Sequence, residues 1–322
     1  MLGGVSIMVG VGWLVLGEGG GTAPRFTGAL EAGASEAPLR AALGEAARPR
    51  RVAQRRRARE REAALPPPVD LRKPDALGSG FGRSRPAAGL LFNLDSGRVL
   101  WRHNPRARRS IASLTKIMSA LVVVDRIRVG ERVAIGERSA QVSGSRVGLR
   151  PGRQIPAESL LDALLIQSGN DAALALATAA SGGVHRFVEE MNDRARELGL
   201  GCTRFVSPHG LQPQNRSCPE DLARLAQLAM ARPRITRAVA KNGAAVPLGG
   251  GSRRLDLFPT NPLLRSGYRG TIGLKTGYTE EAGACLIAVV KRGSQTLVAV
   301  LLDSPDPGGQ AERLFDRAFG ER

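Results

Sequence analysis

Residues 111–125 read Ile-Ala-Ser-Leu-Thr-Lys-Ile-Met-Ser-Ala-Leu-Val-Val-Val-Asp, and this pattern predicts a helix with one buried face. Apolar side chains recur every three or four positions, at Ile111, Leu114, Ile117, Met118, Leu121 and Val122. Three residues make about one helical turn, so we expect the Ser113 hydroxyl to lie beside the Lys116 amine. A hydroxyl and an amine are thereby carried together on a helix that must pack into the core.

Ser113 and Lys116 have the chemistry of a nucleophile and its base. A serine hydroxyl attacks well only when a neighbouring base takes its proton, and a lysine is that base only when its amine is neutral. Lowering the pKa of a lysine from about 10.4 to near 7 takes about 4 kcal/mol, which burial in an apolar helix face can supply. The free backbone N–H groups at the helix start would lie near Ser113 and suit a developing oxyanion.

Two further motifs follow in the chain, Ser168-Gly-Asn170 and Lys275-Thr-Gly277. A random S-x-x-K is expected about 0.3 times in such a chain, but all three motifs in this order fewer than about once in a thousand. Of the 47 basic residues, five are lysine and 42 are arginine, and two of the five lysines stand in these motifs. Because a guanidinium cannot be deprotonated to act as a base, lysine at these positions has a chemical reason.

The three motifs resemble those of the penicillin-recognising serine enzymes, which include penicillin-binding proteins and class A β-lactamases. The sequence around them is similar to the low-molecular-mass D-alanyl-D-alanine carboxypeptidases in residues 167–173, 191–192, 208–211 and 273–279. This likeness runs from about residue 87 to the C-terminus. It implies an active-site cleft between an all-α lobe and an antiparallel sheet.

The residue patterns predict the same α+β class, an antiparallel sheet packed with N- and C-terminal helices beside an all-α lobe. A glycine turn joins strands in a hairpin at 89–101, and shorter strand-like pieces lie at 133–135 and 147–149. Helices are predicted at 158–167, 171–180 (capped by Asp171), 184–198 and 219–231. The last third predicts an antiparallel meander at 271–278, 284–291 and 296–302, and then a closing helix at 311–319.

The resemblance assigns the catalytic roles. Ser113 would attack a carbonyl and form an acyl-enzyme, Lys116 would be its base, and Ser168 would relay a proton to the departing amine. The expected substrate-binding residues are Asn170, Lys275, Thr276, Gly277 and Tyr278. Among these, Asn170 would hold the substrate amide, Lys275 would supply positive potential, and the Thr276 hydroxyl would bind the terminal carboxylate.

The remaining roles concern the backbone. Gly277 would let substrate approach its strand closely, and the N–H groups of Ser113 and Tyr278 would form the oxyanion hole. For Lys275-Thr-Gly277, a plain hairpin edge is the alternative, and for Asn170 a capping role. His209, in a Pro-His-Gly turn, is interpreted as structural.

The activity implied is hydrolysis of the terminal D-Ala-D-Ala bond of peptidoglycan stem peptides, with β-lactams as covalent inhibitors. The alternatives are D,D-endopeptidase action on cross-links, a class A-like β-lactamase and a non-catalytic wall-binding protein. Class A β-lactamases deacylate with a glutamate in an E-x-x-L-N context. The glutamates between the second and third motifs lack that context: Glu189, Glu190, Glu197 and Glu220. We therefore expect slow release of bound penicillin.

The N-terminal part predicts a different organisation. Residues 1–17 are apolar and uncharged, as in a signal or anchor segment, and residues 18–86 read as a disordered Arg/Pro/Gly-rich linker with a short helix near 37–47. The catalytic domain would occupy 87–322. The arginine-rich Arg48–Arg61 is either a solvated tail or a contact to anionic membrane or wall polymer. Although positive residues after an apolar segment favour the cytoplasmic side, the resemblance implies an extracytoplasmic enzyme of the cell envelope.

Composition excludes other classes. The net charge of +18 would attract anionic polymers, but no nucleic acid is expected because no known binding motif is present and only 4% of residues are aromatic. No metal or other cofactor is expected, since the three histidines and three cysteines lack ligand spacing. Cys202 and Cys218 form either a disulfide or two buried thiols, and Cys285 is predicted to lie in the core.

Overall fold

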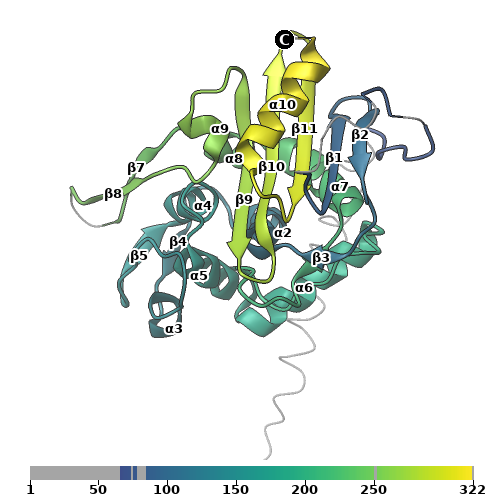
Figure 1. Ribbon diagram of the computed structural model, residues 1–322. Coiled ribbons are helices and arrows are strands. Elements are labelled where there is room, and N and C mark those ends of the chain that lie inside the picture. Colours follow the sequence, from purple (N-terminus) through teal and green to yellow (C-terminus); the bar gives the residue numbers. More distant parts are fainter. Residues whose placement is uncertain (1–65, 74, 78–84, 250–251, 321–322) are drawn as a thin grey trace, which may run out of the picture. The chain divides into compact units, whose positions relative to one another are not determined.

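The computed structural model describes residues 66–73, 75–77, 85–249 and 252–320, and a five-stranded antiparallel sheet lies at its centre (Figure 1). All described residues belong to the second of two compact units, Ala58–Arg322. The strand order is β2-β1-β11-β10-β9. The strands are β1 (Ala88–Asn93), β2 (Val99–His103), β9 (Thr271–Thr279), β10 (Gly283–Arg292) and β11 (Gln295–Leu302). The predicted hairpin and meander are therefore confirmed, and β9 forms one edge of the sheet.

Both faces of the sheet are covered, so β10 and β11 are apolar along nearly their whole length. On one face, Leu286 and Leu301 pack with Phe315 of the C-terminal helix α10 (Pro307–Phe319). On the other, Ile287 and Val300 belong to the larger core shared with the helical lobe. Figure 1 shows α10 lying along β10 and β11, as predicted for the closing helix.

The predicted helices are confirmed within a few residues. They are α2 (Lys116–Arg126), α4 (Ala157–Leu165), α5 (Asn170–Ser181), α6 (Val184–Glu197) and α7 (Pro219–Met230). The α+β class is thus confirmed, whereas the helix predicted near 37–47, the segment 1–17 and Arg48–Arg61 lie outside the described residues. No helix in the described ranges is both long and apolar enough to span a bilayer.

Several short elements were not predicted, because four to seven residues are too few to show a period. They are α3 (Glu137–Ala140), α8 (Pro233–Val239), α9 (Pro262–Arg265), β7 (Ala244–Pro247) and β8 (Arg254–Leu257). Three further two-stranded pieces complete the fold: β3 (Arg109–Ser110) pairs with β6 (Arg216–Ser217), β4 (Arg132–Ala134) with β5 (Gln154–Pro156), and β7 with β8. The β4 strand was predicted.

The helix predicted at 111–125 is more deeply buried than its pattern indicated. It begins as a 3₁₀ turn, η1 (Ala112–Thr115), and continues as α2, in which the eight residues from Lys116 to Val123 are all buried. Helices α4, α5, α6, α7 and α8 all contact α2. A helix that is buried all round is the centre of a core, so the one-face prediction was wrong and its reason is the surrounding helices.

The strand predicted at 147–149 is absent, and Asp171 does not cap its helix. Residues 146–150 have no regular structure, and α5 begins at Asn170, with Gly169 as its N-cap. The buried Asp171 carboxylate instead accepts hydrogen bonds from the backbone N–H groups of Val147, Gly148 and Leu149, at 2.9–3.2 Å. A short apolar run can thus lie buried without forming a strand, because a carboxylate accepts the hydrogen bonds of its backbone N–H groups.

We expect Asp171→Asn to lower the free energy of unfolding by about 3 kcal/mol, because an amide would turn N–H donors toward these backbone donors. Urea unfolding followed by circular dichroism measures this. Asp95→Asn, at an exposed turn, is the matched control and should change the midpoint little. Equal effects of the two substitutions would contradict the structural role of Asp171.

Cys202 and Cys218 form a disulfide, with their Cα atoms 5.6 Å apart and 16 residues between their positions. The alternative of two thiols was therefore wrong for this pair. Cys285 is free and buried, as predicted. The bond closes the loop 203–217, which carries His209.

Removing this disulfide by Cys202→Ser with Cys218→Ser should lower the free energy of unfolding by about 3 kcal/mol, the loop-closure entropy of a loop of this length. The measurement is urea unfolding with and without a reductant. In reductant, the wild-type protein should approach the double variant. A wild-type midpoint that a reductant leaves unchanged would show that the bond does not stabilise the fold.

Part of the predicted linker 18–86 is described, and it contacts the catalytic part. The carbonyl oxygens of Pro66 and Pro67 accept hydrogen bonds from Arg224 and Gln227 of α7, at 3.0 Å each. The Leu77 N–H donates to the carbonyl of Leu100. The domain boundaries of the sequence analysis stay predictions.

Candidate active site

Ser113 lies in the 3₁₀ turn η1, directly after a residue in an unusual conformation. Ala112 has φ +44°, in the left-handed region that residues with a Cβ seldom adopt and that costs about 1–3 kcal/mol. The loop that carries His209 packs against this turn, and a Cβ on Gly210 would come within 2.0 Å of the Ala112 carbonyl oxygen. Only glycine fits at position 210, so the nucleophile turn and the loop are in direct backbone contact.

Lys116 is fully buried, and its amine has three hydrogen-bond partners. Its Nζ lies 2.8 Å from Ser113 Oγ, 2.7 Å from Asn170 Oδ1 and 2.8 Å from the carbonyl oxygen of His209. The two carbonyl oxygens can only accept. A neutral amine has two N–H groups, which these oxygens occupy, and one lone pair, which remains for the Ser113 hydroxyl.

Burial favours this neutral form. Desolvation lowers the pKa of Lys116 well below its ordinary value, and the positive charge of Lys275 lowers it further, while Asp171 opposes the change. Burial also lowers the pKa of Lys275, to about 7. Burial and the nearby Lys116 lower the pKa of His209 to about 4, so its imidazole is neutral at pH 7. The His209 Nδ1 accepts from the Leu211 N–H at 3.3 Å.

The third motif lies on β9, against the nucleophile turn. A Cβ on Gly277 would lie 3.0 Å from the Ser113 nitrogen and 2.9 Å from the Ile111 carbonyl oxygen, so glycine permits this approach. Tyr278 follows with its side chain 70% exposed. Within the described sheet, β9 pairs only with β10. A free strand edge beside a nucleophile can bind an extended peptide.

The side chains of Lys275 and Thr276 in the third motif could still bind an anion. The Lys275 Nζ donates to the Thr276 carbonyl at 2.9 Å, and no carboxylate pairs with it in the described part of the chain. The Thr276 hydroxyl bonds to Thr260 Oγ1 at 2.7 Å. Thr260 in turn donates its N–H to the Ile166 carbonyl, two residues before Ser168. Sequence reasoning missed Thr260, since nothing in its local pattern marks it.

The second motif forms the tight connection between α4 and α5, as predicted. Ser168 has φ +63°, and its hydroxyl is buried without a hydrogen-bond partner. A buried hydroxyl without a partner is costly unless a ligand or water completes it. Asn170 is already engaged, because its Oδ1 accepts from Lys116 and its Nδ2 donates to the Ser143 carbonyl at 2.8 Å.

The structure therefore links the predicted residues unequally. Hydrogen bonds join Ser113, Lys116 and Asn170, and Gly277 contacts the nucleophile turn directly. Lys275 acts on Lys116 through its charge. No hydrogen bond joins the Ser168 hydroxyl to any of them.

The contribution of the His209 carbonyl was not predicted. Buried Asn215 holds this loop: its Oδ1 accepts from the N–H groups of Val206 and Ser207, and its Nδ2 donates to Ser207 Oγ. Its own carbonyl accepts from the Ile111 N–H at 3.1 Å, at the start of the nucleophile turn. The Pro-His-Gly turn was visible in the sequence, but a main-chain contact leaves no signal in residue type.

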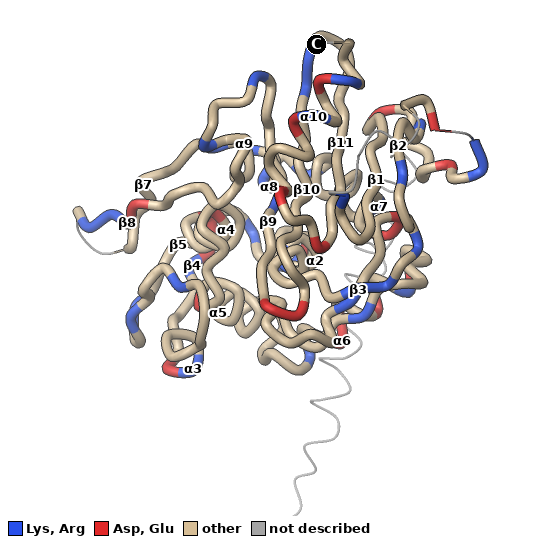
Figure 2. Tube along the Cα trace, in the orientation of Figure 1, with Lys and Arg blue, Asp and Glu red and all other residues tan. Residues whose placement is uncertain are grey.

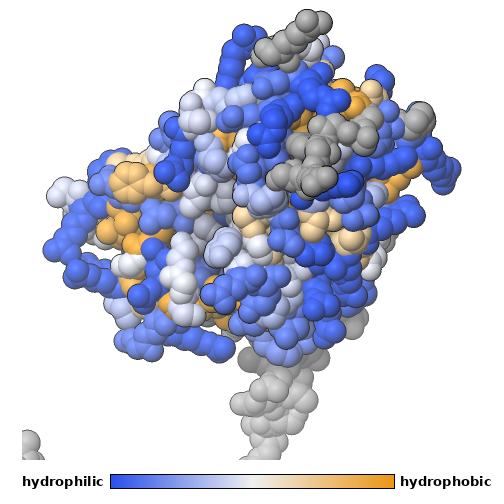
Figure 3. All heavy atoms as spheres, viewed as in Figure 1, coloured by the Kyte–Doolittle hydropathy of each residue, from blue (hydrophilic) through white to orange (hydrophobic). Residues whose placement is uncertain are grey.

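An apolar surface borders the second motif. Phe258 is 70% exposed, and its N–H donates to Gln167 Oε1 at 3.2 Å. Figure 3 shows hydrophobic residues gathered on this side of the molecule, around β8 and α4.

Among the described residues, one group has metal-ligand spacing, Cys202, Cys218 and Asp221, but its sulfur atoms are joined in the disulfide and offer no thiolate.

The acylation rate by a carboxylate-bearing β-lactam should show a bell-shaped pH dependence. At low pH the rate falls because protonated Lys116 cannot accept the Ser113 proton, and above about pH 7 it falls because Lys275 loses its charge. Stopped-flow kinetics between about pH 5 and 9 measure both limbs. In Lys275→Arg the charge is permanent, so the alkaline limb should disappear. An alkaline limb that this substitution leaves in place would contradict the assignment.

Three comparisons place this geometry among known proteins. A family model described as D-alanyl-D-alanine carboxypeptidase matches residues 84–306. D-alanyl-D-alanine carboxypeptidase DacF of Bacillus subtilis is 33% identical over 243 residues, which cover 73% of this chain and 62% of DacF. A D-alanyl-D-alanine endopeptidase of Pseudomonas aeruginosa is 33% identical over 244 residues, 75% of this chain and 76% of that protein.

A solved structure shows the same fold. A mutant of the Streptomyces K15 DD-transpeptidase superposes with a TM-score of 0.69 at 32% identity, over 74% of this chain and 100% of that chain. The chain thus spans less than two thirds of DacF but matches the whole of the transpeptidase. The three relatives are named a carboxypeptidase, an endopeptidase and a DD-transpeptidase, so their names differ in the reaction.

Proposed function

Because the chain belongs to the D-alanyl-D-alanine carboxypeptidase family, we propose that it hydrolyses the terminal D-Ala-D-Ala bond of peptidoglycan stem peptides. The observation that carries the proposal is the buried Lys116 amine, 2.8 Å from Ser113 Oγ, with both its N–H groups taken by carbonyl oxygens. An amine held in this way has one function left to it, which is to accept the proton of the serine.

The geometry supports the following acylation step. Lys116 takes the Ser113 proton, and Oγ attacks the carbonyl carbon of the penultimate D-alanine. The oxyanion is bound by the backbone N–H groups of Ser113 and Tyr278, and the loss of one such donor typically costs about 10²–10³ in rate. When the intermediate collapses, the amine of the terminal D-alanine needs a proton, and in this proposal the Ser168 hydroxyl, which has no hydrogen-bond partner of its own, relays it.

The substrate is oriented by its terminal carboxylate. Lys275 with its proton attracts this carboxylate, and the Thr276 hydroxyl donates to it. Because β9 has a free edge, the peptide can lie along it as an added strand, with Gly277 leaving room beside Ser113. Asn170 orients Lys116 through its oxygen, which adds to the role in substrate binding expected from the resemblance.

Release of the acyl group separates the alternatives. The glutamates that a class A-like mechanism would need are engaged elsewhere: Glu189 with His185, Glu190 with Arg126, Glu197 with Arg194 and Glu220 with Arg106. None of them hydrogen-bonds to Ser113 or Lys116. This supports slow release of penicillin. The ordered Lys116 site argues against a purely wall-binding protein.

Action on cross-links is the second candidate. The Pseudomonas aeruginosa relative is named an endopeptidase at the same 33% identity as DacF. Both reactions use the same acyl-enzyme, so the structure of the leaving amine distinguishes them. Release of D-alanine from a pentapeptide, compared with cleavage of a purified cross-linked dimer, measures the balance.

We further propose an extracytoplasmic site of action. The Cys202–Cys218 disulfide supports it, since such bonds persist in oxidising compartments. The stem peptide is also found there. Contact of Arg48–Arg61 with anionic membrane or wall polymer stays a prediction.

Fluorescent penicillin should label the protein covalently and remain bound for minutes or longer. The reason is that none of the four glutamates hydrogen-bonds to Ser113 or Lys116, where it could activate the water that hydrolyses the acyl-enzyme. Ser113→Ala should abolish labelling, and Lys116→Arg should slow it by at least about 10³-fold, since a guanidinium keeps its proton. Gel fluorescence and D-alanine release measure the two steps. Turnover of many penicillins per second would refute the carboxypeptidase assignment in favour of a β-lactamase.

A further inference from the structure

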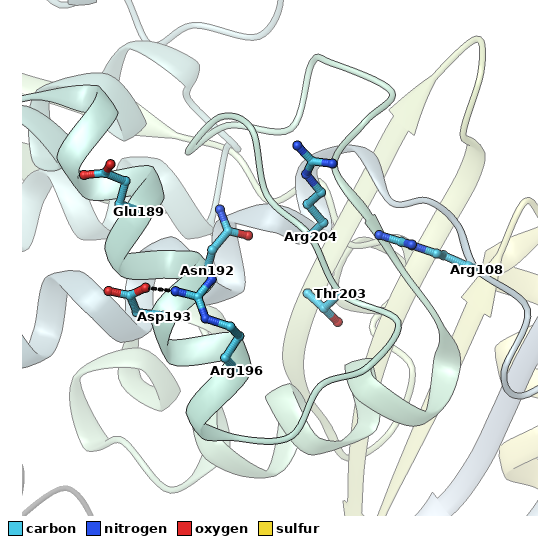
Figure 4. Close-up of a pocket in the computed structure, with 7 residues that line it drawn as sticks. All are labelled: Arg108, Glu189, Asn192, Asp193, Arg196, Thr203 and Arg204. Carbon is cyan, nitrogen blue, oxygen red and sulfur yellow. Dashed lines mark hydrogen bonds and ion pairs between the residues drawn. The ribbon is translucent and has the colours of Figure 1, made fainter.

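A polar pocket lies between α6 and the start of the disulfide loop, and neither Ser113 nor Lys116 lines it (Figure 4). Its volume is about 640 Å³. One wall is α6, and the other is formed by the residue before β3 and by the start of the loop. The lining residues are Arg108, Glu189, Asn192, Asp193, Arg196, Thr203 and Arg204.

Most of the polar groups in this pocket are already bonded. The Asn192 amide bonds to the backbone of Val188 and Phe205, with all contacts at 2.8–2.9 Å. The Thr203 hydroxyl lies 2.6 Å from an oxygen of Asp221. These groups hold α6 against the loop and offer little to a ligand.

The charged groups are unequally satisfied. Arg196 pairs with Asp193, as the dashed line in Figure 4 shows. Arg108 and Arg204 have no ion-pair partner among the described residues, and Figure 4 shows both on the side of the pocket opposite Glu189 and Asp193. Glu189, on the opposite wall, has only the exposed His185 at 3.6 Å. With three arginines and two carboxylates, the lining carries a net charge of +1.

The two unpaired arginines stand on a fixed backbone. Arg204 and Arg216 exchange both backbone hydrogen bonds, at 2.9 and 3.0 Å. This bridge lies beside the β3–β6 pair and the Cys202–Cys218 disulfide. Figure 2 shows basic residues gathered along β3. The backbone that carries Arg204 is therefore fixed, and a planar guanidinium on such a backbone is suited to pairing with a carboxylate.

The pocket is within reach of a substrate bound at Ser113. Arg108 precedes Ser113 by five residues, and five residues of chain span at most about 18 Å. The D-glutamate of a stem pentapeptide is the second residue before the D-alanine that Ser113 attacks, so an extended chain carries it about 7 Å from the serine, and an arginine side chain covers part of the remaining distance. An upstream acidic group of the same peptide can thus meet the arginines while the D-Ala-D-Ala end occupies the catalytic site.

We propose that Arg108 and Arg204 bind a carboxylate of the stem peptide upstream of the scissile bond, and so determine which peptides are good substrates. This rests on the proposed function. A single carboxylate matches the net charge of +1, whereas a polymer of phosphodiesters would bring further negative charges against Glu189 and Asp193. The occupant is therefore an acidic peptide.

The test compares three soluble substrates: L-Ala-γ-D-Glu-L-Lys-D-Ala-D-Ala, the same peptide with the glutamate α-carboxylate amidated, and Nα,Nε-diacetyl-L-Lys-D-Ala-D-Ala. In the wild-type protein, kcat/KM should be about tenfold higher for the acidic peptide than for its amide. Arg108→Gln with Arg204→Gln should remove this preference. The same variant should hydrolyse the amide and the diacetyl tripeptide at unchanged rates, which shows that it is folded.

The matched control is Arg237→Gln with Arg265→Gln, two exposed arginines of α8 and α9 that do not line the pocket. It removes the same amount of charge and should keep the tenfold preference. Equal loss of preference in both double variants would mean that net charge alone, and not the pocket, attracts the acidic peptide.

Two further results would overturn the proposal: no wild-type preference for the acidic peptide, or an equal loss of kcat/KM for acid and amide in Arg108→Gln with Arg204→Gln. If no substrate is hydrolysed by the wild-type protein, the proposed function fails first. Calorimetry on Ser113→Ala then still tests the pocket, because the acidic peptide should bind about tenfold more tightly than its amide. Equal affinities would refute the inference.

Discussion

One buried amine sets the conditions for the rest of this structure. Lys116 has no exposed surface, and its burial outweighs the opposing charge of Asp171, so the fold favours the neutral amine. The carbonyl oxygens of Asn170 and His209 then take both N–H groups, and geometry directs the lone pair to Ser113. Desolvation, which the helical core supplies anyway, thus becomes the source of basicity.

This arrangement needs three segments to meet around η1. The second motif brings Asn170 from the α4–α5 connection, the disulfide loop brings the His209 carbonyl, and β9 brings the third motif. Glycines at positions 210 and 277 allow two of these backbones to approach within distances that a Cβ would forbid. The strained φ angles of Ala112 and Ser168 fall at the same place, as expected where surrounding contacts over-determine a site.

Electrostatics connects the site with the rest of the arginine-rich chain. Two lysines are buried here: burial lowers the pKa of both, and the charge of Lys275 lowers that of Lys116 further, so an anionic ligand that restores the charge of Lys275 finds a receptive site. Arginine could not be tuned in this way, because its guanidinium keeps its proton. The surface arginines instead pair with carboxylates or, as at Arg108 and Arg204, remain available.

The amino-acid sequence alone determined the class of fold, the long helices, the meander and the seven motif residues, because periodicity and residue type are local properties. It could not show that residues 147–149 form no strand, since their N–H groups donate to the distant Asp171 carboxylate. It could not reveal the His209 carbonyl or Asn215 either, because every residue has a carbonyl and only tertiary packing selects which one is used. The lone pair of Lys116 gains its direction from contacts 54 and 93 residues away in the chain, and only the folded structure brings those together.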